Sequence, residues 1–275
     1  MSERVPVTIV TGFLGAGKTT LIKRLIEDAK GTRFGLVVNE FGDMGFDGQM
    51  LSGCMDPACD GGVVELTNGC LCCTVADDFV PALETLLGRE DRPDRIIIET
   101  SGLALPQPLI AAFAWPTVKP RVTVDAVVTV VDVPAVAEGR FAHDPAAVEA
   151  ERRADEALDH DSPLEELFHD QVKAADIVVL SKTDSVEAPM VDGVRSEVAA
   201  LMRPGVSAVD GASPQVFGVG AAAEMDPAAR DGHHTHDNDH EHDDFDSVVI
   251  EARFADRQSA EAAVRAMLQE DAVLR

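Results

Sequence analysis

The chain has 275 residues, 45% of them hydrophobic, which is enough to form the core of one large domain with a smaller appendage. Its 49 acidic and 23 basic residues give a net charge of −26, which disfavours binding to nucleic acid and to anionic membrane surfaces. No apolar run reaches the roughly 18 residues of a membrane span, and the first residues lack the pattern of a signal peptide. We therefore expect a cytoplasmic protein.

Short apolar runs alternate with segments of helical periodicity along most of the chain. The runs expected to be strands are Val5 to Gly12, Phe34 to Asn39, Gly62 to Leu66, Arg95 to Thr100, Val124 to Asp132 and Asp176 to Ser181. The segments expected to be helices are Lys18 to Lys30, Val75 to Leu87, Leu105 to Phe113, Pro145 to Leu158, Pro163 to Ala174 and Val186 to Leu201. This alternation predicts an α/β fold with a doubly wound, mostly parallel sheet, whose ligands bind at the carboxyl ends of the strands.

The first predicted strand leads into "GFLGAGKT", Gly12 to Thr19, which matches the G-x-x-x-x-G-K-[ST] pattern of a phosphate-binding loop. Glycines there allow the backbone N–H groups to face inward around phosphate oxygens, at the start of a predicted helix. Lys18 is expected to reach the β and γ phosphates, and the Thr19 hydroxyl to bind Mg²⁺. A chance glycine-rich turn is the alternative, and the strand and helix on either side disfavour it. The nucleotide-binding residues expected in this segment are Gly12, Gly15, Ala16, Gly17, Lys18, Thr19 and Thr20.

The acidic segment "NEFGDMG", Asn39 to Gly45, follows the second predicted strand, where a first switch loop should lie. Asp43 or Glu40 could contact Mg²⁺ or a second metal. Acidic loop residues are common in so acidic a chain, so a plain loop role stays open. Farther along, Cys54 and Cys59 form a C-x₄-C pair, for which a loop role is favoured over a second thiol site.

Three of the five cysteines, Cys70, Cys72 and Cys73, lie within "NGCLCCT", between a predicted strand and a predicted helix. A helix N-terminus favours thiolates, and therefore both metal ligation and nucleophilic chemistry. For the three thiols to converge, the Asn68-Gly69 turn must curl the chain. Thiolates with open positions suit a metal that is held transiently, whereas a structural zinc site more often shows a second, distant pair of ligands. Buried inert cysteines or a redox pair remain the alternatives.

The predicted strand in "IIIETSG" ends at Glu99, three residues before Gly102. This E-x-x-G stands in the place of the D-x-x-G second switch of GTPases, where the carboxylate helps to hold Mg²⁺ and the glycine N–H senses the γ phosphate. A solvated carboxylate at a strand end is the alternative. We expect Lys18, Glu99 and Gly102 to take part in hydrolysis, and Thr19, Glu99 and Asp43 to bind Mg²⁺.

The segment "SKTD", Ser181 to Asp184, follows the last predicted strand and resembles the N-K-x-D element that recognises guanine. A carboxylate can accept from the two adjacent donors of guanine, whereas adenine presents an acceptor at N1, so Asp184 favours GTP. Lys182 is expected to lie along the base. Ser181 stands where asparagine is usual, so a hydrogen bond that shapes the loop is weaker or replaced. An exposed loop that happens to carry these residues is the alternative.

The C-terminal part begins with "DGHHTHDNDHEHDD", Asp231 to Asp244, which carries five histidines among carboxylates. This composition is typical of a metal-collecting linker, and equally of a solvated hinge. A strand in "FDSVVIEARF" and a helix in "DRQSAEAAVRAMLQE" are expected after it. We predict a P-loop GTPase domain over 1–222, an acidic histidine-rich linker over 223–244 and the start of a short α+β C-terminal domain over 245–275.

Together, "TGFLGAGKTT", "NEFGD", "ELTNGCLCC", "ETSGLALP" and "SKTD" resemble, in this order, the COG0523 GTPases, the P-loop metallochaperones of the SIMIBI class. Within that family the chain is most similar to the members of cobalamin biosynthesis. The similarity lies in "ETSGLALPQPL", the Trp115-Pro116 pair and the acidic insert "DEALDHDSPLEELFHDQV". It covers the chain from Val5 to about Gly220.

The resemblance implies a GTP- and Mg²⁺-dependent carrier that delivers Co²⁺, on GTP hydrolysis, to a cobaltochelatase. Thiolates bind Zn²⁺ more tightly than Co²⁺, so a zinc-supplying GTPase of the same family stays open. A nucleotide-dependent dimer is compatible with this role. The motifs carried over are Cys70, Cys72 and Cys73 for the cargo metal, Gly12 to Thr20 for the phosphates, Glu99 to Gly102 for the second switch and Ser181 to Asp184 for the base.

The cysteine triplet lies between the two switch segments in the sequence. Mg²⁺ and the γ phosphate could therefore hold the loops that shape a thiolate site, and hydrolysis would release the ion. No hydrolytic glutamine or arginine finger is evident, so slow turnover is expected. Two other classes remain open, a P-loop kinase and a structural zinc protein with a vestigial nucleotide site.

Overall fold

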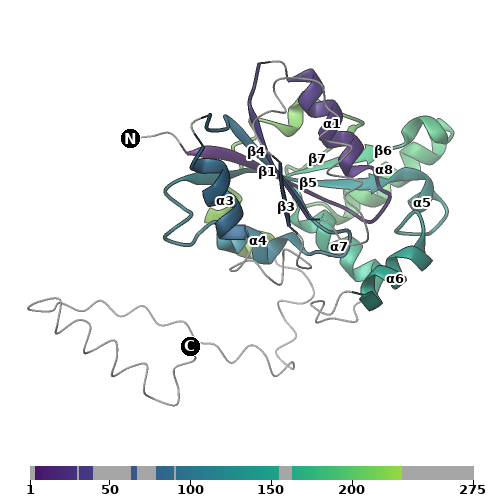
Figure 1. The fold of residues 1–275 in the computed structure, drawn as a ribbon. Helices are drawn as coiled ribbons and strands as arrows, with labels where there is room; N and C mark the ends of the chain where they lie inside the picture. Colours follow the sequence, from purple (N-terminus) through teal and green to yellow (C-terminus); the bar gives the residue numbers. More distant parts are fainter. Residues whose placement is uncertain are drawn as a thin grey trace, which may run out of the picture. The chain divides into compact units, whose positions relative to one another are not determined.

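The computed structural model describes residues 4–29, 31–39, 63–66, 79–89, 91–154 and 163–230, all within a compact unit of Met1–His236 (Figure 1). The histidine-rich segment and the predicted C-terminal strand and helix lie outside the described residues. No helix in the described part has the length and apolar character needed to cross a membrane.

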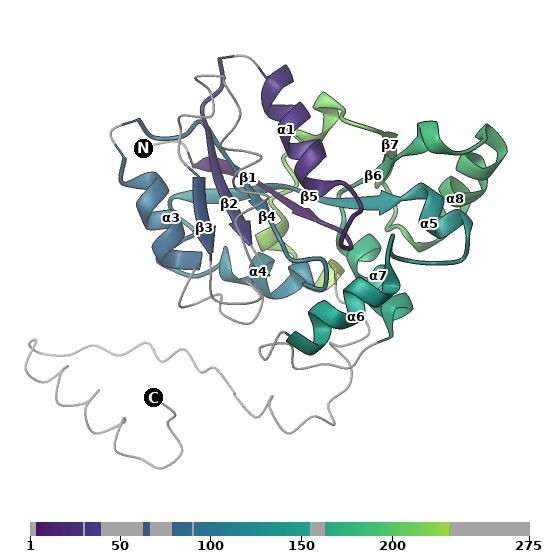
Figure 2. The same ribbon diagram turned by 45° about the vertical axis from the view of Figure 1, so that its right-hand side comes forward.

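Seven strands form one sheet in the described part, and each strand pairs in parallel with its neighbours. Their order is β3-β2-β4-β1-β5-β6-β7 (Figure 2). The first strand along the chain therefore lies in the middle, where the direction of winding reverses, which is the usual ligand position of such sheets. The strands are β1 (Val5–Thr11), β2 (Phe34–Asn39), β3 (Val63–Leu66), β4 (Arg95–Glu99), β5 (Val122–Asp132), β6 (Ile177–Ser181) and β7 (Ser207–Asp210).

Helices cover both faces of the sheet, and alternate side chains of a strand point to opposite helical layers. In β4, Ile97 packs in the core that includes α1, whereas Ile96 and Ile98 pack in the core that includes α3 and α4. This arrangement confirms the predicted doubly wound α/β fold. The helices are α1 (Lys18–Asp28), α3 (Val80–Leu87), α4 (Pro106–Ala112), α5 (Val133–Ala137), α6 (Pro145–Ala154), α7 (Leu164–Ala174) and α8 (Ala188–Leu201).

The predicted strands match the observed ones within two residues at their ends, and one further strand, β7, and one further α-helix, α5, were not predicted. β7 reads "SAVD" and its side chains are half-buried or exposed, so no apolar run marks it. α5 has five residues, too few to show a helical period. α8 begins at Ala188, later than predicted, with Pro189 in its first turn.

Residues 223–230, expected to begin the linker, pack against the sheet instead. The buried carboxylate of Glu224 accepts hydrogen bonds from the Thr123 hydroxyl (2.6 Å) and from the Val124 N–H (3.0 Å) of β5. The buried Arg230 forms an ion pair with Asp176 at the start of β6. The compact domain therefore extends to at least residue 230.

Replacing Glu224 should show whether residues 223–230 belong to the cooperative folding unit. Glu224→Ala leaves the Thr123 hydroxyl and the Val124 N–H without their acceptor, and Arg4, 3.3 Å from the carboxylate, without its counter-charge. We expect the free energy of unfolding to fall by about 2–3 kcal/mol in urea titrations. Glu224→Gln keeps an acceptor and should lose less. A loss below about 0.5 kcal/mol for the alanine variant would contradict the assignment.

Candidate functional site

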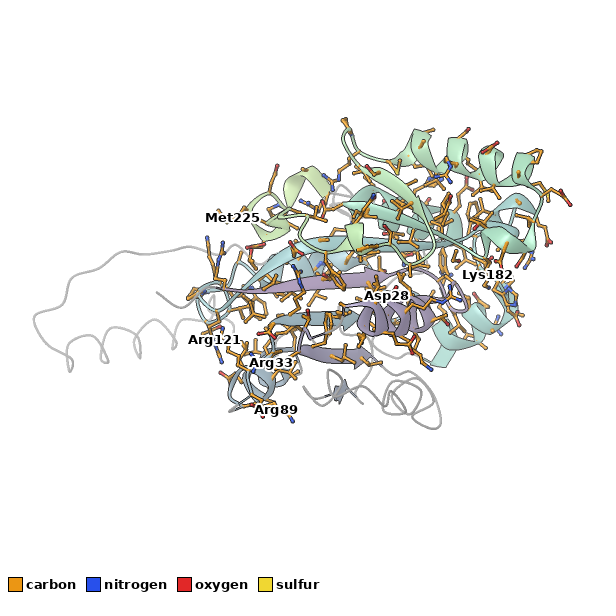
Figure 3. All side chains as sticks on the ribbon, turned by 90° about the horizontal axis from the view of Figure 1, so that it is seen from above. Asp28, Arg33, Arg89, Arg121, Lys182 and Met225 are labelled. Carbon is orange, nitrogen blue, oxygen red and sulfur yellow. The ribbon has the colours of Figure 1, made fainter. Side chains whose placement is uncertain are left out.

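The predicted nucleotide-binding side chains gather where four adjacent strands end. β4, β1, β5 and β6 are neighbours in the sheet and run in parallel, so their carboxyl ends lie along one edge. Thr11, Glu99, Asp132 and Ser181 are the last residues of these strands. In Figure 3 Lys182 lies at this end of the sheet, and Arg33 and Arg121 lie at the other.

The loop after β1 has the backbone geometry of a phosphate cradle. Gly12 has φ +133°, and a Cβ there would lie 2.4 Å from the Val130 carbonyl oxygen of β5, so no other residue fits without moving the strand. Gly17, with φ +98°, is the residue before α1. The N-terminus of α1 is thereby aimed at the loop, where its N–H groups and dipole favour an anion.

The side chain of Lys18 folds back over this loop. Its buried Nζ donates to the Gly12 carbonyl at 2.8 Å and lies 3.4 Å from the Phe13 carbonyl. Backbone carbonyls are weak partners for an ammonium group compared with phosphate oxygens. The residue therefore sits where a bound phosphate would replace these carbonyls.

Thr19 and Glu99 meet beside the loop. The Thr19 hydroxyl donates to Glu99 Oε1 at 2.9 Å, and Glu99 is buried. A hydroxyl and a carboxylate are oxygen ligands of the kind that Mg²⁺ prefers, and the ion could insert between them. The two residues predicted from separate motifs thus form one pair that fits Mg²⁺.

Gly102 brings the predicted second switch against the phosphate loop. A Cβ on Gly102 would lie 2.6 Å from the backbone N of Leu14, so only glycine allows this approach. The Thr100 N–H, between Glu99 and Gly102, donates to the Val10 carbonyl of β1 at 3.0 Å. The whole E-x-x-G segment is therefore fixed next to the loop that follows β1.

The segment after β6 forms the opposite wall of the site. The Ser181 hydroxyl lies 2.7 Å from the Ala16 carbonyl of the phosphate loop and 3.0 Å from the Val131 carbonyl, and it can donate to one of them at a time. Serine therefore ties this segment to the phosphate loop, although the usual asparagine is absent. Lys182 adopts a left-handed conformation (φ +55°) that is uncommon for a residue with a side chain. Asp184 is exposed in a 3₁₀ helix, Thr183–Ser185.

A carboxylate that the sequence analysis did not single out holds Lys182. Buried Asp132 accepts from Lys182 Nζ at 2.6 Å, and its other oxygen accepts from the Ala135 N–H at 3.1 Å, which caps α5. His143 Nδ1 lies 3.6 Å from the same carboxylate, and its Cβ lies beside Gly15 of the phosphate loop. The sequence does contain a signal for Asp132, because this carboxylate ends an apolar run, as Glu99 does.

A cavity of about 310 Å³ lies between these walls. Ala16, Gly17 and Thr20 line one side and the segment from Ser181 to Asp184 lines the other, with Gly211 and Ala212 completing the wall after β7. The Gly211 N–H donates to the Leu180 carbonyl of β6 at 3.0 Å, which fixes this last loop. The sequence analysis missed Gly211 and Ala212 because it missed β7.

The predicted cargo residues Cys70, Cys72 and Cys73 lie outside the described residues, as do the other two cysteines. Asp43, predicted as a Mg²⁺ ligand, also lies outside them. Within the described ranges, no group of three or more His, Cys, Asp or Glu side chains could hold a metal ion.

A second cavity, of about 540 Å³, lies at the amino ends of β1, β2 and β4, at the other edge of the sheet. It is lined by arginines that already have partners. Arg33 binds Asp94 through two guanidinium nitrogens (3.1 and 2.7 Å), and this hydrogen bonding lowers the pKa of Asp94 to about 2. Arg95 binds Asp125 at 2.7 Å. The guanidinium groups of Arg33 and Arg95 at this edge are therefore already paired with carboxylates of the protein.

Comparison with known proteins identifies a family. The nucleotide-binding domain of the CobW/HypB/UreG family matches residues 6–209. A protein of a Sinorhizobium species named zinc chaperone CobW is 50% identical over 99% of this chain and 80% of its own length. A second zinc chaperone CobW, from Pseudomonas aeruginosa, is 48% identical over 85% of this chain and 65% of its own length. Zn(II)-bound YjiA GTPase from E. coli shares the fold at 22% identity, with a TM-score of 0.50 over 80% of this chain and 63% of that one.

Removing the Ser181 hydroxyl tests the tie between the two walls. Ser181→Ala removes the hydrogen bond to the Ala16 carbonyl, so the segment after β6 is no longer fixed to the phosphate loop. We expect nucleotide affinity, measured by calorimetry with GDP, to fall by about three- to tenfold, the worth of one neutral hydrogen bond. Ser185→Ala, an exposed serine of the same loop, is the control and should bind like the wild type. Equal affinity in both variants would show that the tie does not support binding.

Proposed function

This chain belongs to the CobW/HypB/UreG family of nucleotide-binding domains, and from that premise we propose that it is a GTP-dependent metallochaperone. It would bind GTP with Mg²⁺, hydrolyse it slowly, and use the change of nucleotide state to load and release a metal ion at Cys70, Cys72 and Cys73. The proposed nucleotide binding rests on the geometry described above. The proposed metal binding rests on the cysteine motif and on the names of the relatives.

The observation that carries the proposed nucleotide binding is the meeting of three motifs at the carboxyl edge of the sheet. The cavity itself lies between two of them, the phosphate loop and the segment from Ser181 to Asp184. Lys18 would exchange the carbonyls of its own loop for phosphate oxygens, and the N–H groups at the start of α1 would surround the same phosphates. Thr19 and Glu99 would hold Mg²⁺, which when bound neutralises charge that develops on the phosphates. Gly102 lies close enough to the phosphate loop to sense the terminal phosphate.

The base-recognition half of the cavity supports GTP over ATP. Asp184 lines the cavity beside Lys182 and Ser181, so its carboxylate is available to the two adjacent donors of guanine. Lys182 is fixed by Asp132 and can lie against the ring plane without searching for a conformation. This pre-organisation lowers the ordering cost of binding.

We propose Zn²⁺ as the cargo. Two relatives at 50% and 48% identity are named zinc chaperones, and thiolates bind zinc more tightly than cobalt. Delivery of Co²⁺ to a cobaltochelatase is the second candidate, and the similarity of "ETSGLALPQPL" and the acidic insert to cobalamin-biosynthesis proteins favours it. Competition between the two ions for the purified protein, at buffered free concentrations, separates these candidates.

Coupling between the nucleotide state and metal binding would depend on the position of the cysteines between the two switch segments. Moving a metal site from 99% assembled to 99% disassembled requires about 5.5 kcal/mol of differential binding, which the contacts of a γ phosphate and its Mg²⁺ can supply. A nucleotide-dependent dimer and docking to a client enzyme would fit this cycle.

The base preference can be tested by changing the acceptor for guanine. Asp184→Asn removes the carboxylate and presents donors, so guanine loses its partner while xanthine, which has an oxygen at C2, gains one. We expect GTP affinity to fall by about a hundredfold and XTP affinity to rise, in competition with a fluorescent nucleotide. Glu187→Gln removes the same charge nearby at an exposed position and should not change the preference. Unchanged selectivity in Asp184→Asn would contradict the assignment.

The coupling can be tested with metal titrations. We expect the affinity for Zn²⁺ to change at least tenfold when non-hydrolysable Mg·GTP is added, because the γ phosphate reshapes the loops around the thiols. Replacing Cys70, Cys72 and Cys73 together by serine should abolish both the tight zinc binding and this response. Replacing Cys54 and Cys59 instead gives a matched thiol control that should retain both. Equal zinc affinity with and without the nucleotide would end the coupling proposal.

A further inference from the structure

Gln171 is a fully buried polar residue of α7 that contacts the second switch. Its side-chain Nε2 donates to the Gly102 carbonyl at 3.1 Å and to the Ala104 carbonyl at 3.1 Å. Two carbonyl acceptors fix the orientation of the amide, since its oxygen would be repelled at the same place. A single side chain therefore holds the backbone of the switch at two points.

The anchor behind this contact is the central sheet. The backbone carbonyl of Gln171 accepts from the buried Thr129 hydroxyl of β5 at 2.6 Å. Phe168 and Val172, on the same helix, are buried in the core with residues of β5 and β6. Gln171 is thus attached to the central sheet, both through its own backbone and through the core in which its helix packs.

On its other side the switch meets the phosphate loop. Gly102 approaches the Leu14 N so closely that no Cβ fits between them, and Leu103 and Ala104 are buried. The Ala104 N–H donates to the Ser101 carbonyl at 3.1 Å, which closes the turn. The segment from Gly102 to Ala104 therefore lies between the phosphate loop and Gln171, with contacts to both.

The amide oxygen of Gln171 has no hydrogen-bond partner among the described residues, although it is buried. A buried carbonyl without a partner is unfavourable, and a methionine would fill similar space without this cost. The polar side chain is therefore not explained by packing alone. Its contribution lies in the two bonds to the switch.

We propose that Gln171 is a positioning residue that holds the second switch in the arrangement described above, which GDP would leave intact, and thereby sets the preference between GTP and GDP. This inference rests on the proposed nucleotide function. A γ phosphate must draw the Gly102 N–H toward itself, and that movement breaks the hydrogen bonds from Gln171. GDP lacks the γ phosphate and leaves them intact, so Gln171 lowers affinity for GTP without lowering affinity for GDP.

The test compares Gln171→Met, which keeps the length of the side chain and removes both donors, with the wild type. We expect the affinity for a non-hydrolysable GTP analogue to rise about tenfold relative to that for GDP, while the affinity for GDP itself stays unchanged. Thr123→Val is the control, because it removes a hydrogen bond to the buried Glu224 at the other edge of the sheet. It should lower thermal stability and leave the GTP-to-GDP ratio unchanged.

An unchanged ratio in Gln171→Met would overturn the inference and reduce Gln171 to a structural tie. Failure of the wild type to bind either nucleotide would instead overturn the proposed function, so the two failures are distinguishable. If Gln171→Met does not fold, hydrogen exchange of the wild type decides. Amides of residues 103–105, which follow the glycine whose N–H the γ phosphate would hold, should exchange faster with the GTP analogue than with GDP, and equal exchange would overturn the inference.

Discussion

The parallel pairing of β1 with β4 on one side and β5 on the other is the constraint on which the site depends. It brings the ends of strands that are far apart in the sequence to one edge, so that the phosphate loop after Thr11 meets Glu99 and Asp132. Nearly all side chains of these three strands are buried, alternately in two cores, so a slip of register would move each side chain out of the core in which it packs. Packing of the core therefore fixes the positions of the functional side chains at the carboxyl edge of the sheet.

Backbone approaches that only glycine permits make the site compact. Gly12 packs against the Val130 carbonyl and Gly102 against the Leu14 N, so the phosphate loop lies in close backbone contact with β5 and with the second switch. This matters in a chain with a net charge of −26, which as a whole repels a triphosphate. The proposed binding would therefore depend on local groups, namely Lys18, the N–H groups at the start of α1, and Thr19 and Glu99 as the residues that would hold Mg²⁺.

Local patterns in the sequence predicted much of this site, and tertiary contacts supplied what they missed. An apolar run followed by glycines and Lys18 predicted both a strand and a phosphate loop, because those features are adjacent in the chain. The partners of Lys182 and of the second switch, Asp132 and Gln171, come from distant segments, and no spacing rule links them. β7 lacks an apolar run altogether, and residues 223–230 look like a linker until the contacts of Glu224 are seen. The cysteine motif stays a prediction, since it lies outside the described residues.

The bond from Ser181 to the Ala16 carbonyl bears on how nucleotide leaves the protein. It joins the base-binding segment to the phosphate loop, and Asp132 restrains Lys182 within the same assembly. If nucleotide binds as proposed, base and phosphates would be held by one connected assembly, and opening of one loop would not free the guanine while the phosphates stay bound. Dissociation would then begin on the side of the second switch. A protein that accelerates exchange would accordingly engage that side, and residence time would depend on it more than on the contacts made by the base.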